Sequence, residues 1–287
     1  MTTKAPQNAL LVEALAAPGP LVTVELRPPR TDLGREGVMA AWIDLHHTLS
    51  RLTRDQRFVF LTDNAVGAAE EESLAHIGAN VADTVELRRI VPILTTKHTL
   101  EYCQTFASRA ASEGFDALTV LGGDTSVGPP RCVPHGSDLR RILRARVPGL
   151  ALGGWVNPHR DASEQVAFLT AEDAVADFAL SQVVSHHSVA GVERLITELH
   201  RREVHMPVVF GVFYYRSATR KTMETLARFF PVPSDELTRE FESGATAVEI
   251  CARTIRELRA VGADRIYVSN LGNQGASRRL ERILDHV

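Results

Sequence analysis

Eight short apolar runs alternate with stretches of helical character, and this alternation is the strongest constraint on the fold. The runs are continuously hydrophobic, which is typical of strands buried on both faces of a parallel sheet. Strands are expected at Leu21 to Glu25, Phe58 to Thr62, Ile90 to Leu94, Ala117 to Leu121, Leu150 to Trp155, Phe178 to Val183, Val208 to Val212 and Arg265 to Ser269. Helices are expected between them, for example at Val38 to Leu52, Leu100 to Ser112, Val189 to Arg202 and Ala247 to Arg259.

Such a pattern fits either a closed barrel or an open doubly wound sheet. Eight repeats favour closure, and the chain reads LRPPR from Leu26 to Arg30, where a Rossmann sheet needs a glycine-rich turn. The length of 287 residues also suits one (β/α)8 barrel, which typically has about 250. We therefore expect a single-domain (β/α)8 TIM barrel over residues 1–287, with residues 1–20 as an N-terminal extension.

Composition and charge exclude several classes of function. The net charge of -3 argues against a nucleic-acid partner, and no segment approaches the roughly 18 apolar residues of a membrane span. The cysteines Cys103, Cys132 and Cys251 lie far apart, which fits a reducing, cytoplasmic compartment. The histidines, including His186 and His187, follow no metal-binding spacing, so no metal site is expected. The expected assembly is a monomer or a small homo-oligomer.

The carboxyl ends of the strands are the expected functional face, because all eight meet there in a barrel. Glu25 ends an apolar strand, where burial raises a carboxyl pKa and suits a general acid; pairing with Arg27 or Arg30 is the alternative. Asp124 follows Gly122 and Gly123, and it either faces the cavity or caps the next turn.

Other strand ends are candidates for binding. Gln182 offers a donor and an acceptor to a heterocycle edge, or it is a satisfied amide within the barrel. Tyr214 and Tyr215 either stack on a bound ring or pack under the last loops. Asn270 completes the expected substrate-binding set. Cofactor contacts are expected at the remaining strand ends, namely Thr62, Asn64, Thr95, Gly123, Trp155 and His159.

Several of these strand ends resemble those of the methylenetetrahydrofolate reductase family. Val24 to Arg30 reads VELRPPR and is similar to the family's first-strand signature, a glutamate, two residues and then Pro-Pro-Arg. Leu121 to Gly128 resembles its Arg-Gly-Asp turn, and Ala179 to Gln182 resembles its Thr-Gln pair. Phe210 to Val212 stands where the family has Pro-Gly-Ile. The resemblance extends in the same order from about Val22 to Asn270.

This resemblance implies a barrel that reduces 5,10-methylenetetrahydrofolate to 5-methyltetrahydrofolate. Glu25 would be the general acid that opens the five-membered ring to an N5-iminium cation. Asp124 would stabilise that cation, and Gln182 would bind the pterin edge. NADH or NADPH would supply the hydride, and the folate would be the small-molecule partner.

The chain departs from the family where FAD is bound. The family has a basic run after the fifth strand, whereas Phe168 to Asp173 reads FLTAED, whose acidic groups would repel a pyrophosphate. Glycines also stand at 122 and 123, where the family's turn has an arginine. We therefore expect direct hydride transfer without bound flavin. The alternatives are the FAD-dependent reductase, a tetrahydrofolate-dependent methyltransferase or O-demethylase, and a catalytically silent folate-binding protein.

Overall fold

The computed structural model describes residues 9–62, 84–123 and 128–287, and its centre is a closed parallel barrel. The strands pair in sequence order, from β1 to β8, and β8 pairs with β1 to close the barrel. The strands are β1 (Leu21–Leu26), β2 (Val59–Leu61), β3 (Ile90–Thr95), β4 (Ala117–Leu121), β5 (Ala151–Val156), β6 (Phe178–Val184), β7 (Val208–Phe213) and β8 (Arg265–Ser269). The expected (β/α)8 barrel is confirmed.

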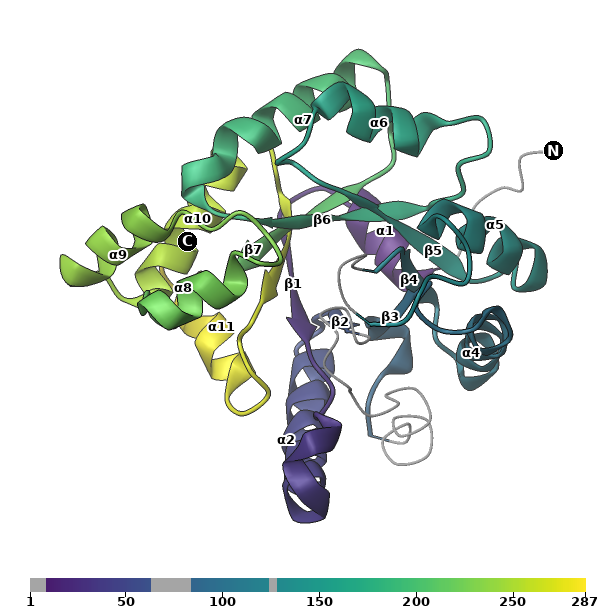
Figure 1. Cartoon of the computed structure of the whole chain (residues 1–287), viewed down its shortest axis with the longest axis horizontal. Helices are drawn as coiled ribbons and strands as arrows, with labels where there is room; N and C mark the ends of the chain where they lie inside the picture. The colour runs from purple at the N-terminus through teal and green to yellow at the C-terminus, as the bar shows by residue number, and fades with distance from the viewer. Residues whose placement is uncertain (1–8, 63–83, 124–127) are drawn as a thin grey trace.

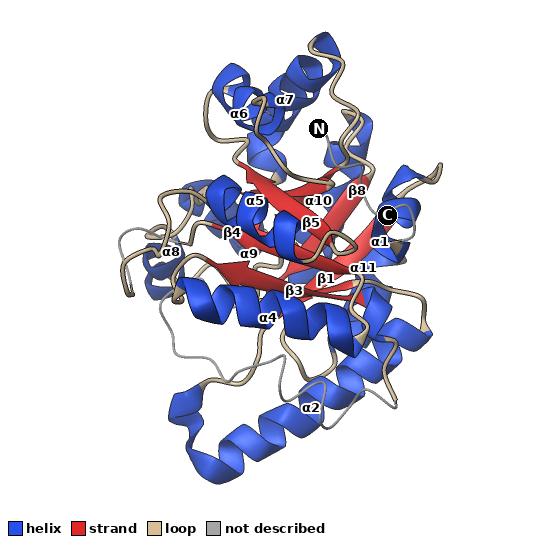
Figure 2. Ribbon diagram, turned by 90° about the vertical axis from the view of Figure 1, so that its right-hand side faces the viewer, coloured by secondary structure: helices blue, strands red, loops and turns tan. Residues whose placement is uncertain are grey.

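Helices surround the strands on the outside of the barrel (Figure 2). They are α1 (Leu10–Ala16), α2 (Gly34–Arg54), α4 (Leu100–Glu113), α5 (Gly136–Arg146), α6 (Ala162–Thr170), α7 (Val189–Arg201), α8 (Arg220–Leu226), α9 (Ser234–Glu242), α10 (Ala247–Ala260) and α11 (Ala276–Leu284). Short 3-10 helices are η1 (Thr31–Leu33), η2 (Leu87–Arg89) and η3 (His186–Ser188). In the part of the chain that the structure describes, no helix is both long and apolar enough to cross a membrane.

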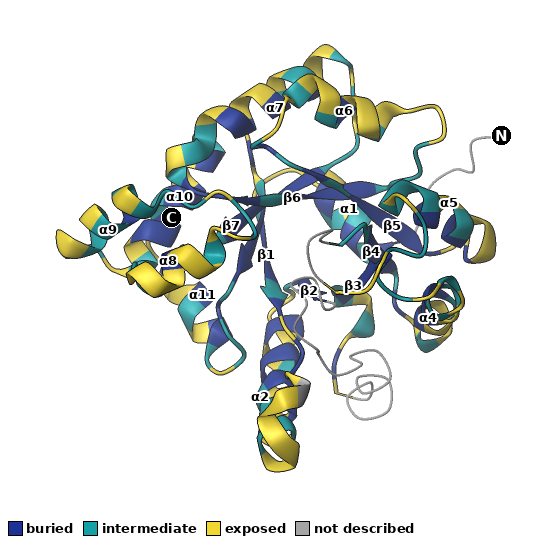
Figure 3. Ribbon diagram, viewed as in Figure 1, coloured by how far each residue is buried: buried dark blue, intermediate teal, exposed yellow. Residues whose placement is uncertain are grey.

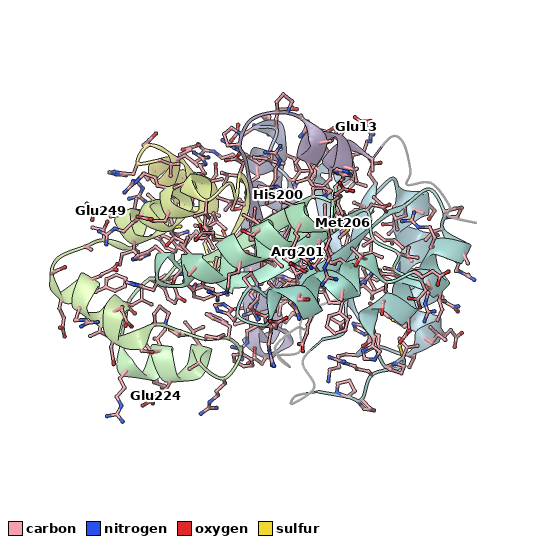
Figure 4. The ribbon with its side chains drawn as sticks, turned by 90° about the horizontal axis from the view of Figure 1, so that it is seen from above. Glu13, His200, Arg201, Met206, Glu224 and Glu249 are labelled. Carbon is pink, nitrogen blue, oxygen red and sulfur yellow. The ribbon has the colours of Figure 1, made fainter. Side chains whose placement is uncertain are left out.

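The outer helices are amphipathic, with buried faces toward the strands and exposed faces toward solvent (Figure 3). In α10, for example, Cys251, Ile255 and Leu258 are buried, as their spacing of three and four residues predicts. Figure 4 shows this layer from above, with Arg201 at the end of α7 and Glu224 on α8 at the outer edge. Two extra helices, α8 and α9, stand between β7 and α10 (Figure 1).

The barrel interior is a packed aromatic core. The Phe60 ring lies 6.0 Å from the Tyr267 ring and 6.4 Å from the Phe178 ring, measured between centroids. Two glycines make room for this core. A Cβ atom at Gly153 would lie 2.5 Å from Phe178, and one at Gly211 would lie 2.5 Å from Tyr267. The amino-terminal part of the barrel is therefore filled by side chains. A functional site is expected at the other end, where the strands have their carboxyl ends.

Helix α1 closes the amino-terminal end of the barrel. Its Leu11 and Leu15 are buried in the same cluster as the interior aromatic residues. The Leu10 amide donates to the Asp116 carboxylate at 3.1 Å, and the Arg265 guanidinium donates to the backbone carbonyls of Leu15, Ala17 and Gly19. Part of the expected N-terminal extension thus belongs to the barrel core.

Candidate active site

Alternation along each strand decides which side chains point into the barrel mouth. Val24 and Leu26 pack outward against the helices, so Glu25 between them faces inward. The same alternation places one inward side chain near the carboxyl end of several other strands. These residues are Thr62, Thr95, Trp155, Phe213 and Ser269.

Glu25 is the acid among these inward side chains, near the carboxyl end of β1. Its Oε1 atom accepts a hydrogen bond of 2.6 Å from the Ser269 hydroxyl, across the β1–β8 seam. Burial raises the pKa of the Glu25 carboxyl, while the Ser269 hydrogen bond and the charge of Arg27 act in the opposite direction with smaller effect. The other candidate partner, Arg30, forms an ion pair with Asp32. Glu25 therefore has the environment of a proton donor.

Tyr267 lies below Glu25 and forms the polar floor of the mouth. It precedes Ser269 by two residues on β8 and so lies on the same face of the strand. Its hydroxyl donates to the Ser181 carbonyl at 2.6 Å. Burial raises the Tyr267 pKa well above its usual value, and the Glu25 charge adds to the shift. Tyr267 thus stays protonated, and its proton is already engaged by the backbone.

Two aromatic side chains, Trp155 and Phe213, are the half-buried walls of the mouth. Phe213 also lies 5.0 Å from the Tyr215 ring and 5.2 Å from the Phe230 ring, between centroids, which fixes its orientation. The hydroxyl-bearing residues Thr62 and Thr95 are buried at the ends of β2 and β3. Flat apolar walls with hydroxyl groups beside them suit a planar heterocycle.

The turn after β4 brings cations close to two glycines. Gly123 has a positive φ of 69°, and a Cβ atom there would lie 2.8 Å from the Lys97 side chain. The Arg131 guanidinium lies against Gly122 and donates to the Gly123 carbonyl at 2.6 Å. An arginine is thus supplied to this turn from further along the chain. Asp124 lies outside the described residues.

Gln182 and His159 are both bonded to the backbone near the end of β6. The register between β6 and β7 shifts between Leu180 and Val183. At this irregularity the Gln182 Oε1 atom accepts from the Val183 amide at 2.9 Å. The His159 ring lies 2.9 Å, through Nε2, from the Val183 carbonyl. This contact fits the second interpretation of Gln182, an amide whose hydrogen bond is made within the barrel.

Tyr214, Tyr215 and Asn270 connect the last two strands. Both tyrosines are buried, Tyr214 in the outer core and Tyr215 beneath the helices that follow β7. Asn270 has a left-handed backbone with φ 68°, and its amide donates to the Tyr214 carbonyl at 3.0 Å. These contacts fit packing and loop anchoring, the alternative for the tyrosines. The remaining cofactor candidate, Asn64, lies outside the described residues.

The acidic segment Phe168 to Asp173 belongs to the outer helical layer. Phe168 is 66% exposed, and Asp173 forms an ion pair of 2.7 Å with Arg141 on the solvent side of α5. The charge of Asp173 is therefore partly compensated by Arg141.

No family model and no curated protein matches this chain. Among solved structures it is similar to a flavocytochrome b2 double mutant with pyruvate bound, at 12% identity and a TM-score of 0.55, over 95% of this chain and 64% of that chain. A protein from Toxoplasma gondii ME49, provisionally named as a deoxyribose-phosphate aldolase, matches at 12% identity over 96% and 95% of the two chains, with a TM-score of 0.44. PhdJ bound to a substrate intermediate matches at 15% identity over 85% and 75%, also with a TM-score of 0.44. These neighbours are enzymes, and at this identity the likeness to flavocytochrome b2 shows the barrel fold alone.

Proposed function

We propose that the chain reduces 5,10-methylenetetrahydrofolate to 5-methyltetrahydrofolate, with NADH or NADPH as the hydride donor. The observation that carries the proposal is Glu25, a half-buried carboxyl group with a raised pKa that faces the barrel interior near the end of β1. Hydride addition to a folate carbon requires that the imidazolidine ring first opens, and ring opening requires a proton on the departing nitrogen. A carboxyl whose pKa is raised by burial is suited to this step.

Ser269 is the positioning partner of Glu25. Its hydroxyl donates to one carboxylate oxygen and leaves the other available to the substrate. Transfer of the Glu25 proton to the ring nitrogen leaves a carboxylate beside the N5-iminium cation. That negative charge would stabilise the cation until the hydride arrives, which couples proton donation to electrostatic stabilisation. The return of a proton from solvent would reset Glu25.

The mouth also fits planar ring systems. Trp155 and Phe213 offer apolar faces, and Thr62 and Thr95 offer hydroxyl groups at the ends of neighbouring strands. A nicotinamide bound there supplies the hydride, and the pterin must lie within contact distance of both the nicotinamide and Glu25. Lys97 and Arg131 beside Gly123 supply positive charge at the rim, where a phosphate or the glutamate tail of folate would be attracted.

Direct transfer without flavin is the finer part of the proposal. It is supported by the acidic groups in Phe168 to Asp173 and by the glycines at 122 and 123, where the resembled family has a basic run and an arginine-containing turn. The Arg131 guanidinium reaches this turn from the following loop. The turn therefore has a positive charge, as in the resembled family, but from a residue outside the turn. A protein that purifies with bound flavin would convert the proposal into the FAD-dependent form of the same reaction.

The test is consumption of NADH or NADPH by the purified protein with methylenetetrahydrofolate and no added flavin, after its visible spectrum has been recorded. Turnover by a colourless protein, with 5-methyltetrahydrofolate as the product, is the expected result. Turnover that appears only after FAD is added would identify the flavin-dependent reductase. No oxidation of either nucleotide under both conditions would contradict the proposal, and methyl transfer from an aryl ether to tetrahydrofolate would then identify the demethylase.

A further inference from the structure

His186, His187 and Glu240 form a compact group at the carboxyl end of β6, away from Glu25 in the chain. The histidines belong to η3, and Glu240 lies on α9. The His186 Nε2 atom is 2.6 Å from Glu240 Oε1, and the His187 Nε2 atom is 2.8 Å from the same oxygen. One potential ligand atom from each residue lies within 4.8 Å of the others. Two separate segments thus direct three metal-ligating side chains at one point.

Thr254 fixes the protonation of one side of the His186 ring. The Thr254 hydroxyl donates its only hydrogen to the Ile250 carbonyl at 3.1 Å. Since that hydrogen is used, Thr254 Oγ1 acts as the acceptor for His186 Nδ1, 3.0 Å away. In this arrangement Nδ1 carries a proton, and Nε2 faces Glu240 Oε1. This hydrogen bond is the kind of contact that orients metal-binding histidines.

The charges in the group favour a cation between the three side chains. A neutral imidazole lone pair facing a carboxylate oxygen is repulsive unless a proton or a metal ion lies between them. Protonating both rings would place two positive charges on rings whose centroids are 4.0 Å apart. The Glu240 Oε2 atom is buried and has no hydrogen-bond partner among the described residues. Arg253 also approaches Glu240 Oε1, at 3.5 Å, and supplies part of the compensating charge from a partly exposed position.

We propose that His186 Nε2, His187 Nε2 and the Glu240 carboxylate bind one divalent transition-metal ion of the zinc class. Two imidazole nitrogens and a carboxylate oxygen are a donor set that suits zinc, with a fourth position left for water. Tetrahedral bonds of 2.0–2.1 Å require ligand atoms about 3.3 Å apart. Each histidine Nε2 atom therefore needs to move away from Glu240 Oε1 by less than about 1 Å.

Such an ion would connect α9 to the end of β6. Helix α9 belongs to the extra segment between β7 and α10, which packs on the barrel through the cluster that contains Tyr215, Met223 and Leu237. Metal binding is therefore expected to stabilise this segment against unfolding, since a ligand that binds only the folded state raises stability. This role is independent of the reaction proposed for Glu25.

The experiment is zinc titration of the full-length protein after treatment with EDTA, measured by calorimetry, with cobalt absorption as a second readout. One ion per chain is expected, with a d–d spectrum typical of four-coordinate cobalt. Glu240→Gln and His187→Ala should each weaken zinc binding more than tenfold. Thr254→Val should weaken it by about 10- to 100-fold, as loss of an orienting contact does.

The matched control is His47→Ala. His46 and His47 are also adjacent and stacked, on α2, and His47 is exposed. Its substitution should leave zinc affinity unchanged. The proposal is overturned if the wild-type protein binds no zinc, or if Glu240→Gln and His187→Ala, both folded by circular dichroism, bind it as tightly as the wild type. His187 is 26% exposed, so that variant is expected to fold.

Discussion

The two ends of the barrel differ in how their charged side chains are paired. At the amino-terminal end, Asp116 accepts from the Leu10 amide and pairs with Arg88, and Arg265 donates to three backbone carbonyls. At the mouth, the Glu25 carboxyl is enclosed and accepts from one hydroxyl, that of Ser269. The first arrangement satisfies each charge, whereas the second keeps a carboxyl in an unfavourable environment. The difference fits a stabilising role for the amino-terminal end and the proton-donor role that we propose for Glu25.

The largest expected effect is a loss of stability caused by a substitution at the amino-terminal end. Leu11 on α1 is fully buried in the interior cluster, so Leu11→Ala should lower the free energy of unfolding by about 2–5 kcal/mol. Turnover per folded molecule should stay close to that of the wild type. Urea denaturation and the activity assay measure the two quantities. Glu13→Ala is the control, because Glu13 is exposed on the same helix (Figure 4). A loss of turnover at full folding would show that the two ends are coupled.

Glu25→Gln should have the converse effect at the mouth. Glutamine keeps the size of the side chain and an acceptor for Ser269, but it has no proton to donate as an acid. Turnover is expected to fall by at least ~10²-fold, as is typical for loss of general acid catalysis. Folate binding and the circular dichroism spectrum should be retained. Near-normal turnover would remove Glu25 from the proposed role and weaken the contrast between the two ends.

The smallest expected effect concerns the pH dependence of stability. Because the pKa of Glu25 is raised above the usual value of 4.5, the folded protein holds this proton to higher pH than the unfolded chain does. The stabilisation is complete below about pH 4.5 and is lost as pH rises through the folded pKa. The melting temperature of Glu25→Gln relative to the wild type should therefore increase over that interval. A difference that is constant with pH would show that the Glu25 pKa is not raised.

Periodicity in the sequence predicts the barrel because local hydrophobic patterns encode strands and helices. The predicted strands at Ala117 to Leu121 and Arg265 to Ser269 match the observed bounds, and the others differ by one residue at one or both ends. The predicted helices shift by similar amounts, and α2 begins at Gly34 rather than Val38. The extra helices α8 and α9 have no counterpart in the strand pattern and were not predicted as separate elements.

The site residues are predictable from the sequence only where the pattern within one strand identifies them. Glu25 interrupts an apolar strand, so its inward position follows from alternation. Its partner Ser269 lies 244 residues away, and no local pattern joins the two. Glu240 likewise meets His186 across 54 residues, a contact that histidine spacing does not predict. Contacts of this kind depend on barrel closure rather than on sequence periodicity.

The contact between Arg265 and helix α1 has a consequence for how the chain acquires its fold. Leu15 and Arg265 are separated by 250 residues, so the segment made first obtains this partner only when the eighth strand has been made. Pairings over such long separations are entropically costly to form and tend to slow folding. Until then the carbonyl end of α1 lacks these hydrogen bonds, and the barrel interior that buries Leu11 and Leu15 is incomplete. A nascent chain that stalls before β8 is therefore expected to expose apolar surface at Leu11 and Leu15.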